Sequence, residues 1–189
     1  LVSRELPPRE PGVITVGSFH GGTKHNIISD RADLQLTVRN TNLETRETLL
    51  KGIKRIAENM GRAAGLPDDK LPEVIYSKSS TPPTINNGPL VRRLKAVWQN
   101  ALGNDQVVSL ASQGMGAEDF PYFTTEPAIP SVYFAIGGTS MADYQAASSG
   151  GPPVASHHSP LFKIEPEPAV TRGVQATVIA LMELMPATP

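Results

Sequence analysis

Cysteine is absent from this chain of 189 residues. The chain therefore has no disulfide, thiolate nucleophile or sulfur-ligated zinc site, and any metal chemistry must use its four histidines and its carboxylates. The 17 basic and 18 acidic side chains leave a formal charge of -1, which gives nucleic acid or an anionic membrane no electrostatic attraction. No apolar run approaches the roughly 20 residues that span a bilayer. The composition is that of a soluble globular protein, for which we favour the cytoplasm as the compartment, with the periplasm as the alternative.

Proline, in contrast, is abundant, with 18 residues, and its positions predict where the chain divides. The clearest boundary combines Pro82, Pro83 and Pro89 with polar residues just before a new amphipathic pattern. We therefore expect two domains, residues 1–80 and residues 81–189. The stretch 137–153, rich in Gly, Ser, Ala and Pro, predicts a surface loop.

The first domain has a legible order of elements. Residues 13–19 and 33–39 predict two strands joined by a Gly-Gly turn, and a helix should begin after Asn42 and run to about residue 64. Residues 73–77 predict a last short strand. Strand, strand, helix, strand is most of a split βαβ (ferredoxin-like) sandwich that lacks its first strand and helix.

The second predicted strand has two different faces. Leu34, Leu36 and Val38 alternate onto an apolar face, whereas Arg39 shares the opposite face with polar side chains. If helices cover the apolar face, the polar face is open to a ligand or partner. Without the missing helix, we expect apolar surface near Leu34, Leu36 and Val38 to be exposed.

The second domain is predicted to contain two helices and two strands. A helix should end near Gly103, strands should cover residues 107–110 and 131–136, and residues 168–185 should form a helix with an apolar stripe. Two strands are too few for a free-standing doubly wound sheet. The fold class is therefore α/β (α+β), with the second domain only a fragment of an α/β layer.

Three motifs carry potential chemistry, and each has an ordinary structural alternative. Residues 21–28 contain a Gly-Gly turn with His25 and Asn26, which could equally be no more than the turn of a β-hairpin. Residues 114–120 hold adjacent carboxylates that could be solvated or cap a helix. The pair His157 and His158 could lie on the surface, and in an extended chain at most one of them would face a metal.

Together the motifs resemble one family along most of the chain. The order of residues 2–5, 17–28, 37–39, 115–120 and 158–160 is similar to the C-terminal part of the zinc-dependent amidohydrolases of the aminoacylase and carboxypeptidase group. The resemblance is closest to the hippurate hydrolase and indoleacetyl-amino-acid hydrolase branch. It implies that residues 1–80 are most of a lid or dimerisation domain and that residues 81–189 are the C-terminal segment of a catalytic domain.

The resemblance also implies roles for individual residues. His158 corresponds to the family's metal-binding histidine near the C-terminus, and Asn26 and Arg39 correspond to the pair that holds the substrate's carboxylate, often in the neighbouring subunit. His25, Gly116 and Glu118 would also line the substrate site. Two zinc ions, or manganese, would activate a water that attacks the amide of an N-acyl amino acid or peptide-like molecule.

The same resemblance implies that the other ligands, the general base and the start of the lid lie before Val2. One ligand does not hold a pair of zinc ions, so we expect the isolated chain to hydrolyse nothing. The alternative is a non-catalytic remnant that serves only for dimerisation or ligand binding. A homodimer through residues 13–45 is expected, because an open sheet edge invites pairing. Ser29 departs from the family's preferred proline, and the long 137–153 segment leaves the acyl and amino-acid specificity open.

Overall fold

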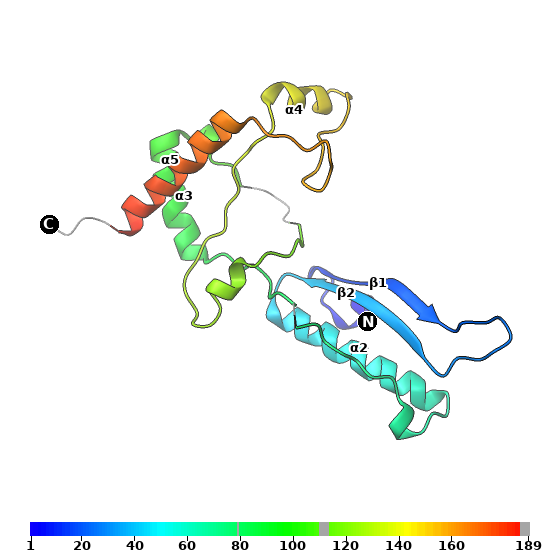
Figure 1. The fold of residues 1–189 in the computed structure, drawn as a ribbon. Helices are drawn as coiled ribbons and strands as arrows, with labels where there is room; N and C mark the ends of the chain where they lie inside the picture. Colours follow the sequence, from blue (N-terminus) through cyan, green and yellow to red (C-terminus); the bar gives the residue numbers. More distant parts are fainter. Residues whose placement is uncertain (79, 110–113, 186–189) are drawn as a thin grey trace. The chain divides into compact units, whose positions relative to one another are not determined.

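The computed structural model describes residues 1–78, 80–109 and 114–185, and the chain divides into two compact units. The first unit is Leu1–Ile85 with Ser112–Ile129, and the second is Asn86–Ala111 with Pro130–Pro189. Helices and strands are mixed, as the sequence predicts, and the described sheet has two strands (Figure 1). In the described part of the chain, no helix is long and apolar enough to cross a membrane.

The first unit is built on an antiparallel hairpin of β1 (Gly12–Gly21) and β2 (Ala32–Asn40). Val16 lies opposite Leu36, Phe19 opposite Leu34 and Val13 opposite Arg39, with a bulge between Val16 and Ser18. Because directly opposed residues share a face, the leucines lie on the apolar side and Arg39 on the polar side. Both predicted strands and the predicted division of faces are confirmed.

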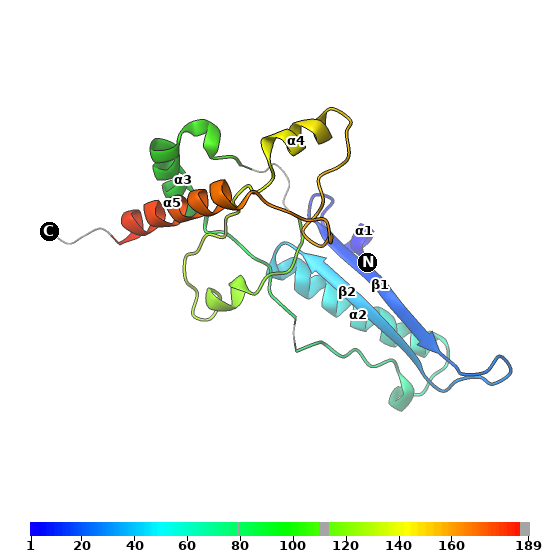
Figure 2. The ribbon, with the colours of Figure 1, turned by 45° about the horizontal axis from the view of Figure 1, so that its top comes forward.

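Helix α2 (Leu43–Ala63) runs along this hairpin, as Figure 2 shows. The Asn42 side chain caps it by accepting a hydrogen bond from the Thr45 N–H at 2.8 Å, and Gly65 follows its end with φ +79°. Leu49 is fully buried, and its Cδ1 would lie 3.3 Å from a Cβ added at Gly12, which indicates close packing of α2 on β1. The short helix α1 (Val2–Glu5) precedes the hairpin, and Leu1 packs against Gly52 of α2.

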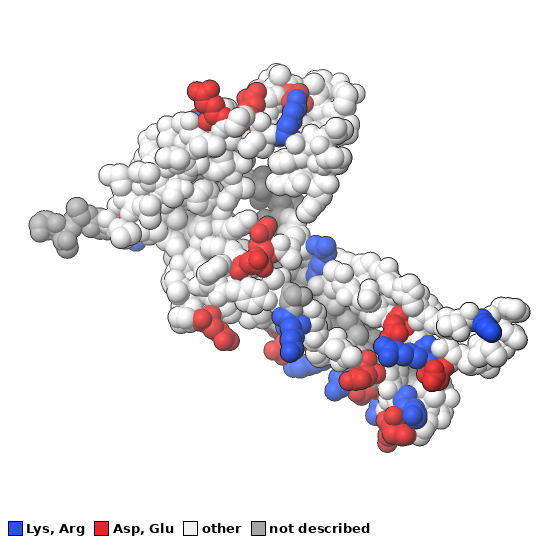
Figure 3. All heavy atoms as spheres, in the orientation of Figure 1, with Lys and Arg blue, Asp and Glu red and all other residues white. Residues whose placement is uncertain are grey.

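Charged side chains decorate the outer surface of α2. Glu47 and Lys51 pair at 2.7 Å, and Glu58 lies 3.8 Å from both Lys54 and Arg62. Over this helix, Figure 3 shows acidic and basic side chains interspersed. These i, i+4 pairs keep the polar side of α2 in water, while its apolar side faces the hairpin.

Much of the hairpin's apolar face is exposed. Phe19 is 67% exposed, Leu34 50% and Leu36 40%, whereas Val38 is half-buried nearer the start of α2. The expected exposure is therefore confirmed at Leu34 and Leu36, whereas Val38 is only partly exposed. Ile56 and Met60 of α2 are exposed as well.

The predicted strand at residues 73–77 is wrong, because these residues pair with no described strand. A split βαβ sheet places another strand between two parallel strands that are joined by a helix. A β-strand is stable only when a neighbouring backbone satisfies its hydrogen bonds, and β2 has only β1 beside it. A short 3-10 turn, Asp68–Lys70, precedes this segment.

The second unit is organised by α3 (Gly88–Leu102) and α5 (Pro166–Leu184). Asn87 caps α3 by accepting from the Leu90 N–H at 3.0 Å, and the Trp98 indole N–H donates to the Ala176 carbonyl at 2.8 Å. The buried core is Leu94, Trp98 and Ala176. Both helices are confirmed. The apolar side chains of the predicted stripe of α5 are exposed, namely Val170, Val174, Val178, Leu181 and Met185.

Two further expectations for this part of the chain are wrong. Residues 131–136 form no strand, because Asn86 satisfies the Tyr133 backbone with its side chain, at 2.7 Å to N and 2.9 Å to O. Residues 107–109 form no strand either, and Leu110 lies outside the described residues. Short 3-10 turns occupy Asn104–Gln106 in this unit and Phe120–Phe123 in the first.

The predicted loop at 137–153 contains a helix, α4 (Met141–Ser148). Ser140 caps this helix by accepting a hydrogen bond from the Asp143 N–H at 3.0 Å. A serine N-cap followed by alanine-rich sequence is a helix signal that the bulk composition of the segment concealed.

Leu49→Ala tests the core of the first unit. Removing this fully buried side chain should lower the free energy of unfolding by about 2–4 kcal/mol, because a cavity replaces its contacts with the hairpin. Met60→Ala, on the exposed side of the same helix, is the matched control and should change it by less than about 0.5 kcal/mol. Equal losses in urea denaturation would contradict this description of the core.

Candidate functional site

The predicted site residues fall in both units. His25, Asn26, Arg39, Gly116 and Glu118 belong to the first unit, and His158 belongs to the second. The geometry within each unit decides which of them can act together.

Arg39 contacts the loop that carries Gly116 and Glu118. Its Nη1 donates a hydrogen bond to the Met115 carbonyl at 2.7 Å, across 76 residues of sequence. This bond uses one of the five N–H donors of the guanidinium, and the Arg39 side chain is exposed. The structure therefore brings Arg39 beside the predicted lining loop and leaves it donors for a further partner.

The Glu118 carboxylate is exposed, and no described residue bonds to it. After Asp119, the loop tightens into the 3-10 turn Phe120–Phe123, and the Tyr122 hydroxyl donates to the Ser80 carbonyl at 2.7 Å. A shallow hollow lies beside this turn, lined by Lys78, Thr81, Asp119, Tyr122 and Phe123. No sequence pattern predicts this hollow, because the residues near 80 and those near 120 share no motif or periodicity.

His25 and Asn26 lie in the connection between β1 and β2, residues 22–31, at the far end of the hairpin from Arg39 (Figure 1). Ala32 and Arg39 are seven residues apart in an extended strand, which corresponds to about 24 Å. The loop that holds Asn26 therefore does not meet Arg39 within one chain. The two residues do not form a single carboxylate-binding pair in the structure of one subunit.

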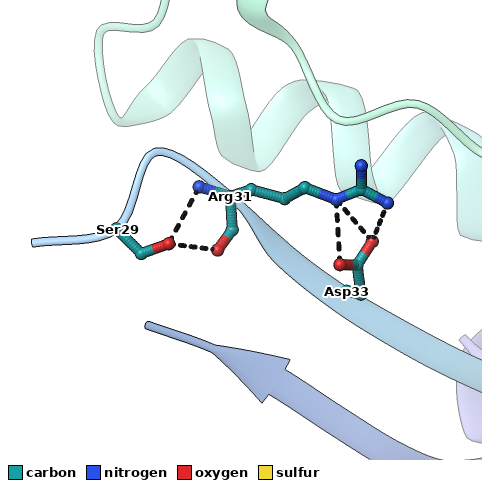
Figure 4. Close-up of polar contacts among 3 residues, drawn as sticks. All are labelled: Ser29, Arg31 and Asp33. Carbon is teal, nitrogen blue, oxygen red and sulfur yellow. Dashed lines mark hydrogen bonds and ion pairs between the residues drawn. The ribbon is translucent and has the colours of Figure 1, made fainter. Parts of the chain in front are cut away.

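An ion pair fixes the base of this connecting loop, as Figure 4 shows. The Arg31 guanidinium donates to Asp33 at 2.7 and 2.9 Å, and Ser29 Oγ bonds the backbone of Arg31. The hydrogen bond from Arg31 lowers the pKa of the Asp33 carboxyl, and Asp33 in turn raises the pKa of Arg31. The pair's contribution is therefore present above the ordinary pKa of an aspartate and is lost as pH falls through the lowered one.

His158 lies in a pair of consecutive turns. The Ser159 N–H donates to the Ser156 carbonyl at 2.9 Å, and the Phe162 N–H donates to the Ser159 carbonyl at 3.0 Å. The expectation of an extended chain at the two histidines therefore does not hold. The His157 ring stacks on Phe162 with centroids 5.0 Å apart, while His158 is exposed and contacts no described partner.

The described residues do not make a complete metal centre by themselves. Nowhere in residues 1–78, 80–109 and 114–185 do three or more His, Cys, Asp or Glu side chains come together in a way that could hold a metal ion. A catalytic zinc usually takes three protein ligands. His158 is free to supply one ligand and no more.

Comparison with known proteins identifies one domain in the first unit. Residues 8–64 match the peptidase dimerisation domain of the M20 family. The chain is 34% identical over 140 residues to an uncharacterized hydrolase of Sinorhizobium fredii, covering 72% of the chain and 32% of that protein.

Two relatives have named activities. Identity is 30% over 137 residues to an N-acetyldiaminopimelate deacetylase of Streptococcus thermophilus, covering 72% of the chain and 34% of the relative. The chain is also 32% identical over 166 residues to an IAA-amino acid hydrolase of Arabidopsis thaliana. This match covers 87% of the chain and 34% of the relative. The chain thus spans about a third of the length of these relatives.

Two solved structures of hydrolases also match the chain. A protein of methicillin-resistant Staphylococcus aureus named as an aminohydrolase matches with a TM-score of 0.76 and 25% identity, over 96% of the chain and 42% of that protein. A dinuclear metal-binding peptidase of the M20 family from Bacillus subtilis matches in fold, with a TM-score of 0.60 and 22% identity. This match covers 92% of the chain and 42% of that protein. The resemblance found in the motifs is therefore confirmed, and the chain belongs to the M20 peptidase family, whose dimerisation domain it carries.

Proposed function

We propose that this chain is part of a metal-dependent amidohydrolase that cleaves the amide bond of N-acyl amino acids or small peptides. The observation that carries the proposal is the Arg39 to Met115 hydrogen bond, which sets an exposed guanidinium beside the Gly116 and Glu118 loop. The relatives support it, because a deacetylase of an N-acetylated amino acid and an IAA-amino acid hydrolase both act on an acyl group joined to an amino acid.

Arg39 is proposed to hold the substrate's carboxylate. A guanidinium donates two parallel, charge-assisted hydrogen bonds to a carboxylate, and Arg39 has donors left after bonding Met115. A carboxylate bound there lies next to Gly116 and Glu118. Glycine at position 116 meets no neighbouring atom that a side chain would strike, so the loop backbone is open to a substrate.

The metal is proposed to come together only in the complete protein. Two zinc or manganese ions would supply an activated water there, and the Bacillus subtilis neighbour is named as a dinuclear metal-binding peptidase. From this chain we assign His158 as a ligand, since its exposed ring is free of described partners. The remaining ligands and the general base are assigned to sequence outside the chain, so the isolated chain is expected to be inactive.

His25 and Asn26 are proposed to act in the site of the neighbouring subunit. Their loop lies about 24 Å of strand away from Arg39, so one site uses both sets only if two chains contribute. The match to a dimerisation domain over residues 8–64 supports a homodimer, and we place its interface in residues 13–45.

Arg39→Ala in the complete protein tests the carboxylate assignment. The apparent binding of an N-acyl amino acid should weaken by about 1.5–3 kcal/mol, roughly a 10- to 150-fold rise in KM, because a charged hydrogen bond is lost. The same substrate with its carboxylate amidated is the control and should show little change between wild type and variant. An unchanged KM for the free acid would rule out Arg39 as the carboxylate ligand.

Light scattering across concentration tests the homodimer. The chain should pass from monomer to a defined dimer, and Phe19→Asp should raise the dissociation constant at least about tenfold, because it would place a charge within the assigned interface, residues 13–45. Phe123→Asp, at a side chain of similar exposure outside residues 13–45, should leave the dissociation constant unchanged. Equal effects of the two variants, or open-ended aggregation of the wild type, would contradict the assigned interface.

A further inference from the structure

The loop that carries His25 and Asn26 has few contacts of its own. All ten residues of 22–31 are exposed, and the backbone hydrogen bond described inside the loop joins the Ile27 N–H to the Lys24 carbonyl at 3.3 Å. A loop with so little packing loses conformational entropy when a ligand or partner orders it. Any contact that restricts the loop beforehand therefore favours binding through it.

Such contacts lie in the second leg of the loop, which we define as residues 28–31, the part that leads into β2. Ser29 Oγ donates to the Arg31 carbonyl at 2.7 Å and accepts from the Arg31 N–H at 3.2 Å, so one hydroxyl bonds both backbone groups of Arg31 (Figure 4). These bonds hold the chain that leads from Asn26 and Ile28 into β2. The hydroxyl of Ser29 therefore restricts the backbone by hydrogen bonds, where a proline at position 29 would restrict it by its ring.

The Arg31 side chain then ties this leg to the strand. Its Nε donates to both Asp33 oxygens at 2.9 Å and its Nη2 donates to Oδ1 at 2.7 Å, which is a two-pronged contact with one carboxylate. Asp33 itself is fixed in the β2 ladder opposite His20 of β1. The chain of contacts therefore runs from the regular hairpin, through Asp33 and Arg31, to Ser29.

We propose that Ser29, Arg31 and Asp33 are positioning residues, which hold the second leg of the 22–31 loop so that His25 and Asn26 point in one direction. The expected effect on substrate binding rests on the proposed function of His25 and Asn26. The order of the loop can be measured independently of that function. Exposed ion pairs contribute little to global stability. The effect of breaking this one is therefore confined to the loop.

The test measures backbone order by ¹⁵N relaxation in the chain itself. Wild-type His25 and Asn26 should have order parameters above about 0.6, and Asp33→Asn or Ser29→Ala should lower them below that value. The melting temperature should stay the same. The charge swap that combines Arg31→Asp with Asp33→Arg should restore the order, because it rebuilds the ion pair.

Glu47→Gln is the matched control. It breaks an exposed pair of the same kind, Glu47 with Lys51 at 2.7 Å on α2, and should leave the loop unchanged. The proposal is wrong if the wild-type loop already has order parameters below about 0.6, or if Asp33→Asn has no more effect than Glu47→Gln.

The complete protein separates this inference from the proposed function. If Asn26→Ala leaves KM unchanged while its loop stays ordered, the proposed role of Asn26 fails and the positioning inference stands. If Asp33→Asn disorders the loop, KM should rise with kcat much less affected, because substrate binding is what the loop serves. A kcat loss at constant KM would contradict the positioning role.

Discussion

The antiparallel register of β1 and β2 is the constraint on which the first unit depends. It places Leu34 and Leu36 on one face and Arg39 on the other, and it sets the loop with His25 and Asn26 at one end of the hairpin and Arg39 at the opposite end. A slip of one residue would exchange the two faces. The register therefore decides that Arg39 meets the Met115 loop, and that Asn26 does not join it within the same chain.

The two ends of the hairpin are held in different ways. At one end, Arg39 bonds a carbonyl from a distant part of the sequence, and at the other, Arg31 of the connecting loop bonds the carboxylate of Asp33, two residues away at the start of β2. Both arginines are exposed, yet each has a defined partner. In the proposed amidohydrolase, one end recognises substrate in its own subunit, and the other presents a loop to the neighbouring one.

Local signals were enough to predict the elements that form without distant partners. Asn42 and Gly65 bound α2, and alternation located β1 and β2. The strands expected at 73–77 and 131–136 are wrong, because strand formation requires a neighbouring backbone that periodicity does not reveal. The Arg39 to Met115 bond joins residues 76 apart and leaves no pattern in the sequence, whereas the Arg31 and Asp33 pair could have been found as opposite charges two residues apart where the loop enters β2.

The carbonyl ¹³C signal of Met115 tests most directly the claim that Arg39 ties the hairpin to the loop. Labelling methionine carbonyls and glycine nitrogens selects the two Met-Gly pairs, Met115 with Gly116 and Met60 with Gly61. The Met60 carbonyl accepts from the Ala64 N–H in α2 and is the internal reference. In Arg39→Ala, the Met115 signal should move upfield because it loses its donor, while the Met60 signal stays in place. A Met115 signal that does not move would contradict the account.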